Sequence, residues 1–473
     1  MVVVSVGGWM TKRRARVIGA GLAGAEAAWQ LACRGVSVDL YEMRGVRATP
    51  VHHTTDFAEL VCSNSLGGQA LSVASGLLKE EMRRMGSVVI AAADRHAVPA
   101  GGALAVDRDH FARAVTATVS AHPWITVHRE EVQDFDFDIP TVVATGPMTS
   151  DVLAARLQAL AGEAYLFFYD AAAPIVTVDS LDHRKIFRAG REGLAQRRAR
   201  QAGEVVEEAC GDYLNCPFDK AEYEAFWAAL VAGENAVLHH EGDQRFFESC
   251  LPIEVIARRG VDTMRYGPMK PLGLVDPATG RRPWAVVQLR QDNAVASLFN
   301  LVGFQTQLKW GEQTRIFRMI PGLEQAEFVR LGVMHRNTYL NSPHLLHPTL
   351  QWKGHAQLFA AGQMIGVEGY TDSAAMGALA GINLARVMRG EDALAFPKET
   401  MLGALSHYIA EASARYFQPM NANWGLLPPL EDVVRDKLLK RERLAQRASE
   451  VWASFWAASG EGMVVPAVDL VSV

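Results

Sequence analysis

The stretch Arg16–Glu42 constrains the fold more than any other part of this 473-residue sequence. Its residue types predict an apolar strand over Arg16–Ile18, a glycine-rich turn over Gly19–Gly24, a helix over Ala25–Arg34 and a second strand over Val36–Tyr41. A strand, a tight turn and a helix that leads into another strand form one unit of a parallel α/β sheet.

The turn has the pattern GxGxxG, in which each glycine has a separate task. Gly19 permits the tight bend, Gly21 lets a pyrophosphate approach the backbone, and Gly24 lets the helix pack closely on the strand. Glu42 follows Gly24 by 18 residues, close to the roughly 20-residue spacing of an acid that binds a ribose hydroxyl. We therefore predict a dinucleotide-binding unit rather than a purely structural one. Its candidate cofactor-binding residues are Gly19, Ala20, Gly21, Leu22, Ala23, Gly24 and Glu42.

A second strand–glycine–helix unit lies near the C-terminus. The apolar segment His355–Ile365 reaches Gly362, and a glycine turn with a helix of small residues follows it. The GxGxxG turn alone does not separate FAD from NAD. The pairing of an N-terminal with a C-terminal unit favours FAD as the tightly held cofactor.

Between these two units the composition becomes rich in strand-forming residues, from Tyr165 onwards. The fold class we expect is α/β, a Rossmann-like FAD-binding domain of the glutathione-reductase type with an inserted α+β domain. We predict a disordered extension at 1–14, the first part of the FAD-binding domain at 15–164, an inserted substrate or RNA domain at 165–325, the second part of the FAD-binding domain with C-terminal helices at 326–455, and a tail at 456–473.

Several further elements are predicted from local pattern. Glu80–Met85 and Asp107–Val115 indicate helices, and Ser87–Ala92 indicates a strand. A polar helix is expected from Arg184 to about Glu208, and mostly helical structure from Ser406 to Ser454.

Composition excludes several classes of protein. With 49% hydrophobic residues, 21% charged residues and a net charge of −5, the chain is typical of a globular enzyme without general affinity for nucleic acid. No apolar run approaches the ~18–20 residues of a membrane span. The five widely spaced cysteines indicate reduced thiols in a cytoplasmic protein, and no Cys/His cluster indicates a metal site.

Two cysteines are candidates for chemistry because of their neighbours. Cys62 lies in a polar turn soon after the ribose-binding strand, and Cys250 lies beside a proline-bounded turn. The alternative for each is a buried thiol that acts as a small hydrophobe. Cys33, on the expected Rossmann helix, is interpreted as a core residue, and Cys210 and Cys216 as structural.

Two basic runs are candidates for contacts with phosphates. The first includes Arg184, Lys185, Arg188 and Arg191, and the second lies between Arg435 and Arg443. The ordinary interpretation of such runs is a solvated helical face. His335 is interpreted as a core or loop histidine.

Long blocks in one order give the sequence a resemblance to a known family. They include GAGLAGAEAAWQLACRG, YEMRGVRATPVHHTTDFAELVCSNSL, CLPIEVIARRG, NLVGFQTQLKWGEQ and AAGQMIGVEGYTDSAAMGALAG. From about Arg16 to Pro429 the chain resembles the folate- and FAD-dependent tRNA (uracil-5-)-methyltransferases. The resemblance implies methylation at C5 of the T-loop uridine of tRNA (uridine 54), with 5,10-methylenetetrahydrofolate as carbon donor. Reduced FAD would supply electrons, and NADPH or NADH would regenerate it.

The resemblance also implies roles for individual residues. Cys250 would add to C6 of uracil, and Cys62 would be the second catalytic cysteine, assisting removal of the C5 proton. Ser249 departs from the glycine expected before that nucleophile. Glu42 and the glycine turn would hold the ADP half of FAD, and Gly362, Gln363 and Gly366 would lie beside the isoalloxazine. Arg184, Lys185, Arg188 and Arg191 become better candidates for RNA binding.

Three other functions stay open at this point. A homologue of the same chemistry could act on ribosomal RNA, and a flavin oxidoreductase could act on a small molecule without RNA. A non-catalytic RNA-binding protein could keep FAD structurally. The preference between NADPH and NADH, and the oligomeric state, are not fixed by the sequence.

Overall fold

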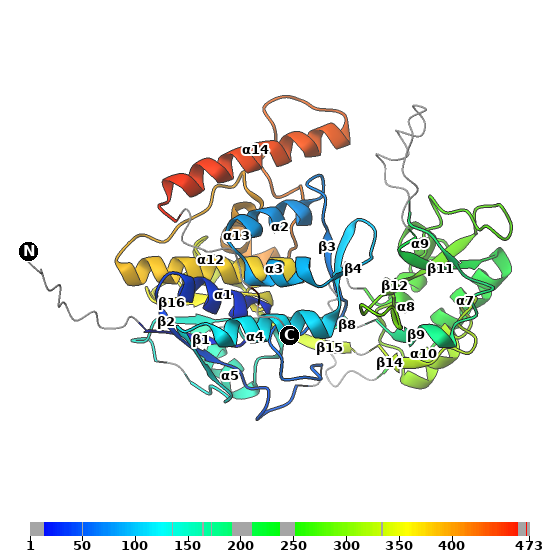
Figure 1. Ribbon diagram of the computed structural model, residues 1–473, viewed down its shortest axis with the longest axis horizontal. Coiled ribbons are helices and arrows are strands. Elements are labelled where there is room, and N and C mark those ends of the chain that lie inside the picture. The colour runs from blue at the N-terminus through cyan, green and yellow to red at the C-terminus, as the bar shows by residue number, and fades with distance from the viewer. Residues whose placement is uncertain are drawn as a thin grey trace, which may run out of the picture.

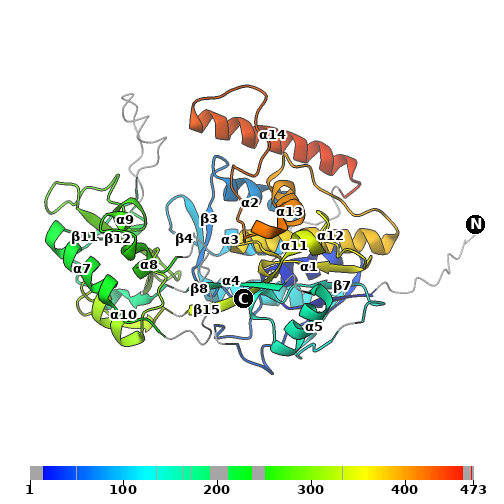
Figure 2. The ribbon, with the colours of Figure 1, turned by 180° about the vertical axis from the view of Figure 1, so that it is seen from behind.

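The computed structural model shows two lobes side by side (Figures 1 and 2). It describes residues 14–49, 51–134, 136–162, 165–171, 173–191, 211–236, 251–332, 334–461 and 470, with the backbone alone at 165–171 and 334–338. One lobe holds both chain ends of the described part, and the other consists of a central stretch of the chain (green in Figure 1).

A five-stranded parallel sheet is the centre of the larger lobe. Its order is β16-β7-β1-β2-β6, and every pair of neighbours is parallel. The strands are β1 (Arg14–Ile18), β2 (Ser37–Tyr41), β6 (Ile125–His128), β7 (Thr141–Val143) and β16 (Leu358–Ala360). The parallel order places the N-terminal and C-terminal units in one sheet, which confirms the predicted fold class.

Two helices that lie on this sheet pack against each other through glycines. Helix α1 (Leu22–Cys33) follows the glycine turn and contacts α12 (Tyr370–Arg389) over its length. A Cβ added to Gly377 of α12 would lie 2.2 Å from the carbonyl oxygen of Ala23. Because no side chain fits in that space, the small residues of α12 are required for the approach of the two helices.

A three-stranded sheet and three helices pack around α1 and α12. The strands are β3 (Ser65–Gly68), β4 (Ala97–Val98) and β5 (Ala103–Val106), and the helices are α2 (Ala74–Arg84), α3 (Val88–Arg95) and α4 (Arg108–Ala121). The predicted strand over Ser87–Ala92 is wrong, because this segment starts α3. The Ser87 hydroxyl accepts a hydrogen bond from the Ile90 backbone N–H (3.1 Å), which caps a helix that the β-branched residues alone disfavour.

The smaller lobe is built on a six-stranded antiparallel sheet in the order β10-β11-β12-β13-β9-β14. Its strands are β9 (Ile175–Thr177), β10 (Phe187–Arg188), β11 (Tyr213–Phe218), β12 (Ala285–Gln291), β13 (Leu298–Leu301) and β14 (Phe328–Arg330). Its helices are α7 (Lys220–Ala232), α8 (Ile253–Arg258), α9 (Thr263–Tyr266) and α10 (Trp310–Phe317). This lobe has an apolar core of its own. The antiparallel pair β8 (Tyr165–Ala171) and β15 (Met334–Leu340) connects it with the larger lobe.

The predicted polar helix from Arg184 to Glu208 is wrong where the structure describes it. Residues up to 191 form turns and the short strand β10, which pairs with β11, and 192–210 lie outside the described residues. Pairing with a neighbouring strand has here overridden the local helix propensity.

The remaining helices cover the larger lobe. They are α5 (Asp151–Ala161), α11 (Ser342–Leu345), α13 (Met401–Glu411) and α14 (Lys437–Ala458). Between α13 and α14 the described chain is mostly irregular, so the prediction of mostly helical structure from Ser406 to Ser454 is only partly correct. Helix α14 lies across the top of the lobe in Figure 1. No helix in the described ranges has both the length and the apolar character needed to cross a membrane.

Candidate functional site

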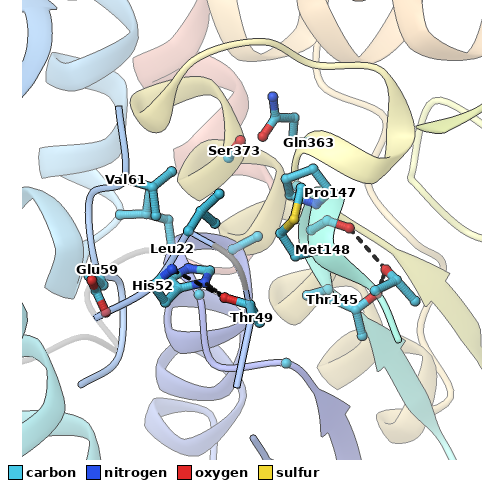
Figure 3. A pocket seen from close by; sticks show the side chains of 18 of the residues that line it. Leu22, Thr49, His52, Glu59, Val61, Thr145, Pro147, Met148, Gln363 and Ser373 are labelled. Atoms are coloured by element: carbon cyan, nitrogen blue, oxygen red, sulfur yellow. Dashed lines mark hydrogen bonds between the residues drawn. The ribbon is translucent and has the colours of Figure 1, made fainter. Parts of the chain in front are cut away.

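A cavity of about 330 Å³ lies between the glycine turn, the segment 59–65, the end of β7 and the start of α12. In Figure 3, Thr49, His52 and Glu59 line one side, and Thr145, Pro147 and Met148 line the opposite side. Gln363 and Ser373 lie above them in the same view. The cavity therefore follows the carboxyl ends of the parallel strands, where ligands bind in doubly wound folds.

The glycine turn forms one end of the cavity. Gly19 has φ +96°, and a Cβ there would lie 2.5 Å from the carbonyl oxygen of Ala144. A Cβ on Gly24 would lie 1.8 Å from the carbonyl oxygen of Gly19. A Cβ on Gly21, in contrast, would meet nothing within 4 Å, and Gly21 lines the cavity. The open space beside Gly21 and the start of α1, whose first N–H groups have no partner within the helix, fit a pyrophosphate.

Glu42 lies beside this turn, at the end of β2. Its carboxylate accepts hydrogen bonds from the Ala20 backbone N–H (2.9 Å) and from the guanidinium of Arg44 (3.0 Å). Burial raises the pKa of Glu42, but Arg44 and the backbone donors more than offset it, so this pKa lies below its ordinary value. The carboxylate is thus charged and held against the cavity, as an acid for ribose hydroxyls requires.

The C-terminal glycine unit forms the other wall. Gly362 and Gln363 line the cavity, and Gln363 donates a hydrogen bond to Glu368 (2.8 Å). Gly366 does not line it: its φ is +88°, and the ring of Phe417 occupies the place of a Cβ. Two further predicted cofactor-binding residues, Ala20 and Gly24, do not line the cavity either.

Cys62 lines the same cavity and contacts Tyr370, the first residue of α12. The Tyr370 hydroxyl accepts hydrogen bonds from the backbone N–H groups of Cys62 (2.8 Å) and Ser63 (3.2 Å). The same hydroxyl lies 3.1 Å from Cys62 Sγ. A hydroxyl oxygen has two acceptor positions, and these two N–H groups occupy both. The proton of the Tyr370 hydroxyl is therefore directed towards the sulfur.

Tyr370 keeps that proton at neutral pH. Burial and the neighbouring sulfur of Cys62 raise the pKa of Tyr370 well above its ordinary value. A protonated phenol at this distance is a donor that stabilises negative charge on sulfur.

Three arginines hold the backbone and side chains around Cys62. Arg108 of α4 donates to the carbonyl oxygen of Leu60 (2.6 Å), and Arg330 of β14 donates to the carbonyl oxygen of Val61. Arg290 of β12 donates to the Ser63 hydroxyl (2.7 Å) and to the amide oxygen of Asn64 (2.9 Å). Two of these arginines belong to the smaller lobe, so both lobes position this loop.

The other cysteines have different environments. Cys216 is fully buried, whereas Cys33 is partly buried and packs against the core. Burial raises the pKa of Cys33 to about 11 and raises that of Cys216 further, so neither thiol is readily ionised. Cys250, Ser249 and Cys210 lie outside the described residues, as does the side chain of His335. In the described part of the chain, no group of three His, Cys, Asp or Glu side chains is arranged to hold a metal ion.

The predicted RNA-binding residues lie in the smaller lobe and do not line the cavity. Arg184 pairs with Asp182 (2.9 Å), and Lys185 pairs with Glu324 (2.6 Å). Arg188 is exposed on β10, whereas Arg191 is partly buried and donates to the carbonyl oxygen of Pro268 (3.4 Å).

Sequence reasoning missed Tyr370 and the three arginines. Tyr370 is 308 positions from Cys62, and Arg290 is 227 positions from Ser63. The one signal in the sequence is the position of Tyr370 directly after a glycine turn, at the start of a helix whose N-terminus faces the cofactor unit.

Comparison with known proteins identifies relatives over nearly the whole chain. The family described as "Glucose inhibited division protein A" (GidA) matches residues 14–392. A protein of Desulforamulus reducens is 57% identical over 93% of this chain and 97% of its own length. Proteins of Enterococcus faecalis (55%; 94% of this chain, 98% of its own) and Symbiobacterium thermophilum (56%; 95% and 98%) are similarly close. All three are named methylenetetrahydrofolate--tRNA-(uracil-5-)-methyltransferase TrmFO.

Solved structures of Aquifex aeolicus GidA have the same fold. The form II crystal structure matches with a TM-score of 0.64 at 15% identity, over 94% of this chain and 74% of that one. The form I structure matches with a TM-score of 0.63 at 16% identity, over 93% and 76%. At this identity the likeness concerns the fold alone.

Proposed function

This chain belongs to the GidA family and, within it, to the methylenetetrahydrofolate--tRNA-(uracil-5-)-methyltransferases TrmFO, and from this membership we propose that it methylates C5 of the T-loop uridine in tRNA. The carbon donor is 5,10-methylenetetrahydrofolate, and the reductant is FAD that NADPH or NADH reduces. The observation that supports this most directly is the cavity that the dinucleotide motif and Cys62 line together. The reaction is assigned to the cytoplasm, where tRNA is modified.

The residues around the cavity fit FAD. Gly21 and the start of α1 would hold the pyrophosphate, Glu42 the ribose, and Gly362 with Gln363 the region next to the reacting ring. When bound and reduced, FAD supplies the two electrons that convert the transferred methylene into a methyl group.

Uracil C5 needs a nucleophile at C6 before it can attack a carbon electrophile. We assign this addition to the thiolate of Cys250, because sulfur adds and leaves reversibly near neutral pH. C5 then forms a bond with the one-carbon unit as the first of its two bonds to folate nitrogens breaks. Removal of the C5 proton lets the second carbon–nitrogen bond break and leaves a methylene group on C5. With the hydride that reduced FAD would supply, this methylene becomes the methyl group, the Sγ–C6 bond breaks and 5-methyluridine leaves.

Cys62 is assigned the removal of the C5 proton. A thiolate accepts a proton directly, and Cys62 lies in the cavity with the hydroxyl proton of Tyr370 directed at its sulfur. Tyr370 would stabilise the thiolate before the transfer and keep Sγ in one position. Arg184, Lys185, Arg188 and Arg191 are assigned contacts with the tRNA backbone, where arginine and lysine bind phosphates without regard to sequence.

The test uses purified holoenzyme, unmodified tRNA, NADPH and methylenetetrahydrofolate labelled at the methylene carbon. Digestion and mass spectrometry should find label in 5-methyluridine from the T-loop. Label in ribosomal RNA alone would support the proposed chemistry but would identify ribosomal RNA, and not tRNA, as the substrate. Absence of label from both RNAs, with protein whose flavin NADPH reduces, would contradict the proposal and favour a small-molecule oxidoreductase.

A further inference from the structure

The loop that carries Cys62 lies against an excess of positive charge, which is buried at Arg290 and half-buried at Arg108 and Arg330. Arg108, Arg290 and Arg330 come from α4, β12 and β14, and each interacts electrostatically with Cys62. Arg290 is only 7% exposed, and the side chain of Arg108 only 12%. A guanidinium stays charged at every pH at which proteins are studied, so the three carry three positive charges.

One carboxylate partly compensates this cluster. Asp292, whose side chain is 4% exposed, forms a bidentate pair with Arg108 at 2.9 and 3.1 Å. Among the described residues, the other ionisable group in contact with Cys62 is Tyr370, which is neutral. Glu59, upstream in the same loop, is held by Arg44 at 3.4 Å and by the His53 backbone N–H at 2.8 Å.

The charge balance therefore favours an anion at the position of Cys62. Among the residues that the structure describes around this loop, three guanidinium groups and one carboxylate leave an excess of two positive charges beside a partly buried sulfur. Burial of uncompensated charge is unfavourable, and ionisation of the thiol reduces the excess to one. Cationic neighbours are the usual means by which proteins keep a cysteine as thiolate.

We propose that Arg108, Arg290 and Arg330 hold Cys62 in its thiolate form and fix its position, so that the smaller lobe supplies part of the environment of a thiol located in the larger lobe. The arginines are positioning residues, because they act through Cys62 and its loop. The inference rests on the proposed function only for the use of the thiolate as a base. The ionisation itself is measurable without RNA or folate.

The test is alkylation of the holoenzyme with iodoacetamide over a series of pH values, followed by mass spectrometry of the Cys62 peptide. The wild-type rate should reach half its maximum clearly below the ordinary thiol pKa of about 8.5. In Arg290→Gln and Arg330→Gln the midpoint should rise by about one pH unit, which lowers the rate at acidic pH about tenfold. Arg290→Lys should retain most of the wild-type midpoint, because it keeps the charge.

Two further variants test the direction of the midpoint shift and the effect of removing an arginine elsewhere. Asp292→Asn removes the carboxylate of the cluster and should shift the midpoint downwards. Arg282→Gln is the matched control, because Arg282 is an exposed arginine just before β12 with no contact to the Cys62 loop within the described ranges. Flavin content, measured on every sample, identifies any variant that has lost its fold.

A wild-type midpoint at or above about 8.5 would overturn the inference, and this measurement needs no substitution. Midpoints of Arg290→Gln and Arg330→Gln equal to that of Arg282→Gln would also overturn it. If the enzyme methylates tRNA but the alkylation midpoint of Cys62 is not lowered, the proposed function stands and this inference is rejected. A shifted thiol in a protein that methylates no RNA would support the inference and reject the proposed function.

Discussion

The hydroxyl oxygen of Tyr370 lies 3.1 Å from the sulfur of Cys62 and accepts the backbone N–H of the same cysteine at 2.8 Å. A residue at the start of α12 and a residue in a loop of the first half of the chain thus share one short network. Because α12 also packs against α1, the sulfur is fixed relative to the glycine turn. The proposed roles of Cys62 and of the cofactor motif depend on this relationship.

Tyr370→Phe tests that network. The substitution removes the proton donor to Sγ and leaves the N–H groups of Cys62 and Ser63 without their acceptor. We expect a fall of about tenfold or more in kcat with little change in flavin content, and a loss of about 1–2 kcal/mol in the free energy of unfolding. Steady-state kinetics, flavin absorbance and chemical unfolding measure these three quantities. Wild-type kcat would show that the hydroxyl has no part in the reaction.

Gly21→Ala and Gly24→Ala separate cofactor binding from packing. A Cβ at Gly21 meets no protein atom, so the apoprotein should keep its stability within about 0.5 kcal/mol but lose FAD, whose pyrophosphate needs that space. A Cβ at Gly24 meets the Gly19 carbonyl oxygen at 1.8 Å, so this variant should lose about 2–3 kcal/mol or more of stability. Thermal unfolding of the apoproteins and titration with FAD distinguish the two. Equal stability of both apoproteins would contradict the packing role of Gly24.

Glu81 should make stability depend on pH. Burial raises its pKa to about 7 from an ordinary 4.5, although its carboxylate accepts the Met401 and Leu402 backbone N–H groups at 2.8 Å. The folded chain therefore binds a proton here more strongly than the unfolded chain, and the contribution to stability present below pH 4.5 is lost as the pH rises to about 7. Glu81→Gln should remove this contribution.

The measurement is the Tm of wild type and Glu81→Gln at several pH values. The Tm difference, variant minus wild type, should increase between about pH 4.5 and 7 and level off above. Asp94→Asn, a change at a more exposed carboxylate that pairs with Arg83, is the control. A constant difference for Glu81→Gln across this window would show that Glu81 is ionised in the folded protein throughout.

Arg188→Ala tests the predicted RNA contacts. Arg188 is exposed on β10, and the loss of one phosphate contact should weaken tRNA binding a few-fold and lower the slope of log affinity against log salt by about one. Arg156→Ala removes an exposed arginine of α5 in the larger lobe and should change neither quantity. Filter binding over a salt series measures both. Identical slopes of log affinity against log salt for the two variants would show that Arg188 does not contact RNA phosphates.

The parts of the fold that could be predicted from the sequence are those determined by local geometry. The turn Gly19–Gly24 requires glycine at defined positions, and the parallel strands on either side are short apolar runs. For the same reason the second unit around Gly362 could be recognised. Ser87–Ala92 was predicted as a strand because its valines favour one, whereas the Ser87 cap and burial against the core decide for a helix.

The environment of Cys62 could not be predicted in this way. The residues around it, Tyr370, Arg108 and Arg290, lie in three separate elements, 48 to 308 positions from the loop residues they contact. No local pattern relates residues so far apart. The sequence context indicated that Cys62 lies near the cofactor. The proton donor and the positive charge that we propose to activate this thiol depend on the packing of both lobes.

Methylation of uridine at C5 with Cys62 as the base predicts that one C5 proton is lost for each methyl group gained. The most direct measurement uses tRNA with tritium at C5 of its uridines, and compares tritium released to water with labelled methyl incorporated from the folate. Wild-type enzyme should give the two in equal amounts, and Cys62→Ala, with FAD bound, should give neither at a measurable rate. Tritium release by Cys62→Ala at the wild-type rate would show that another group removes the proton.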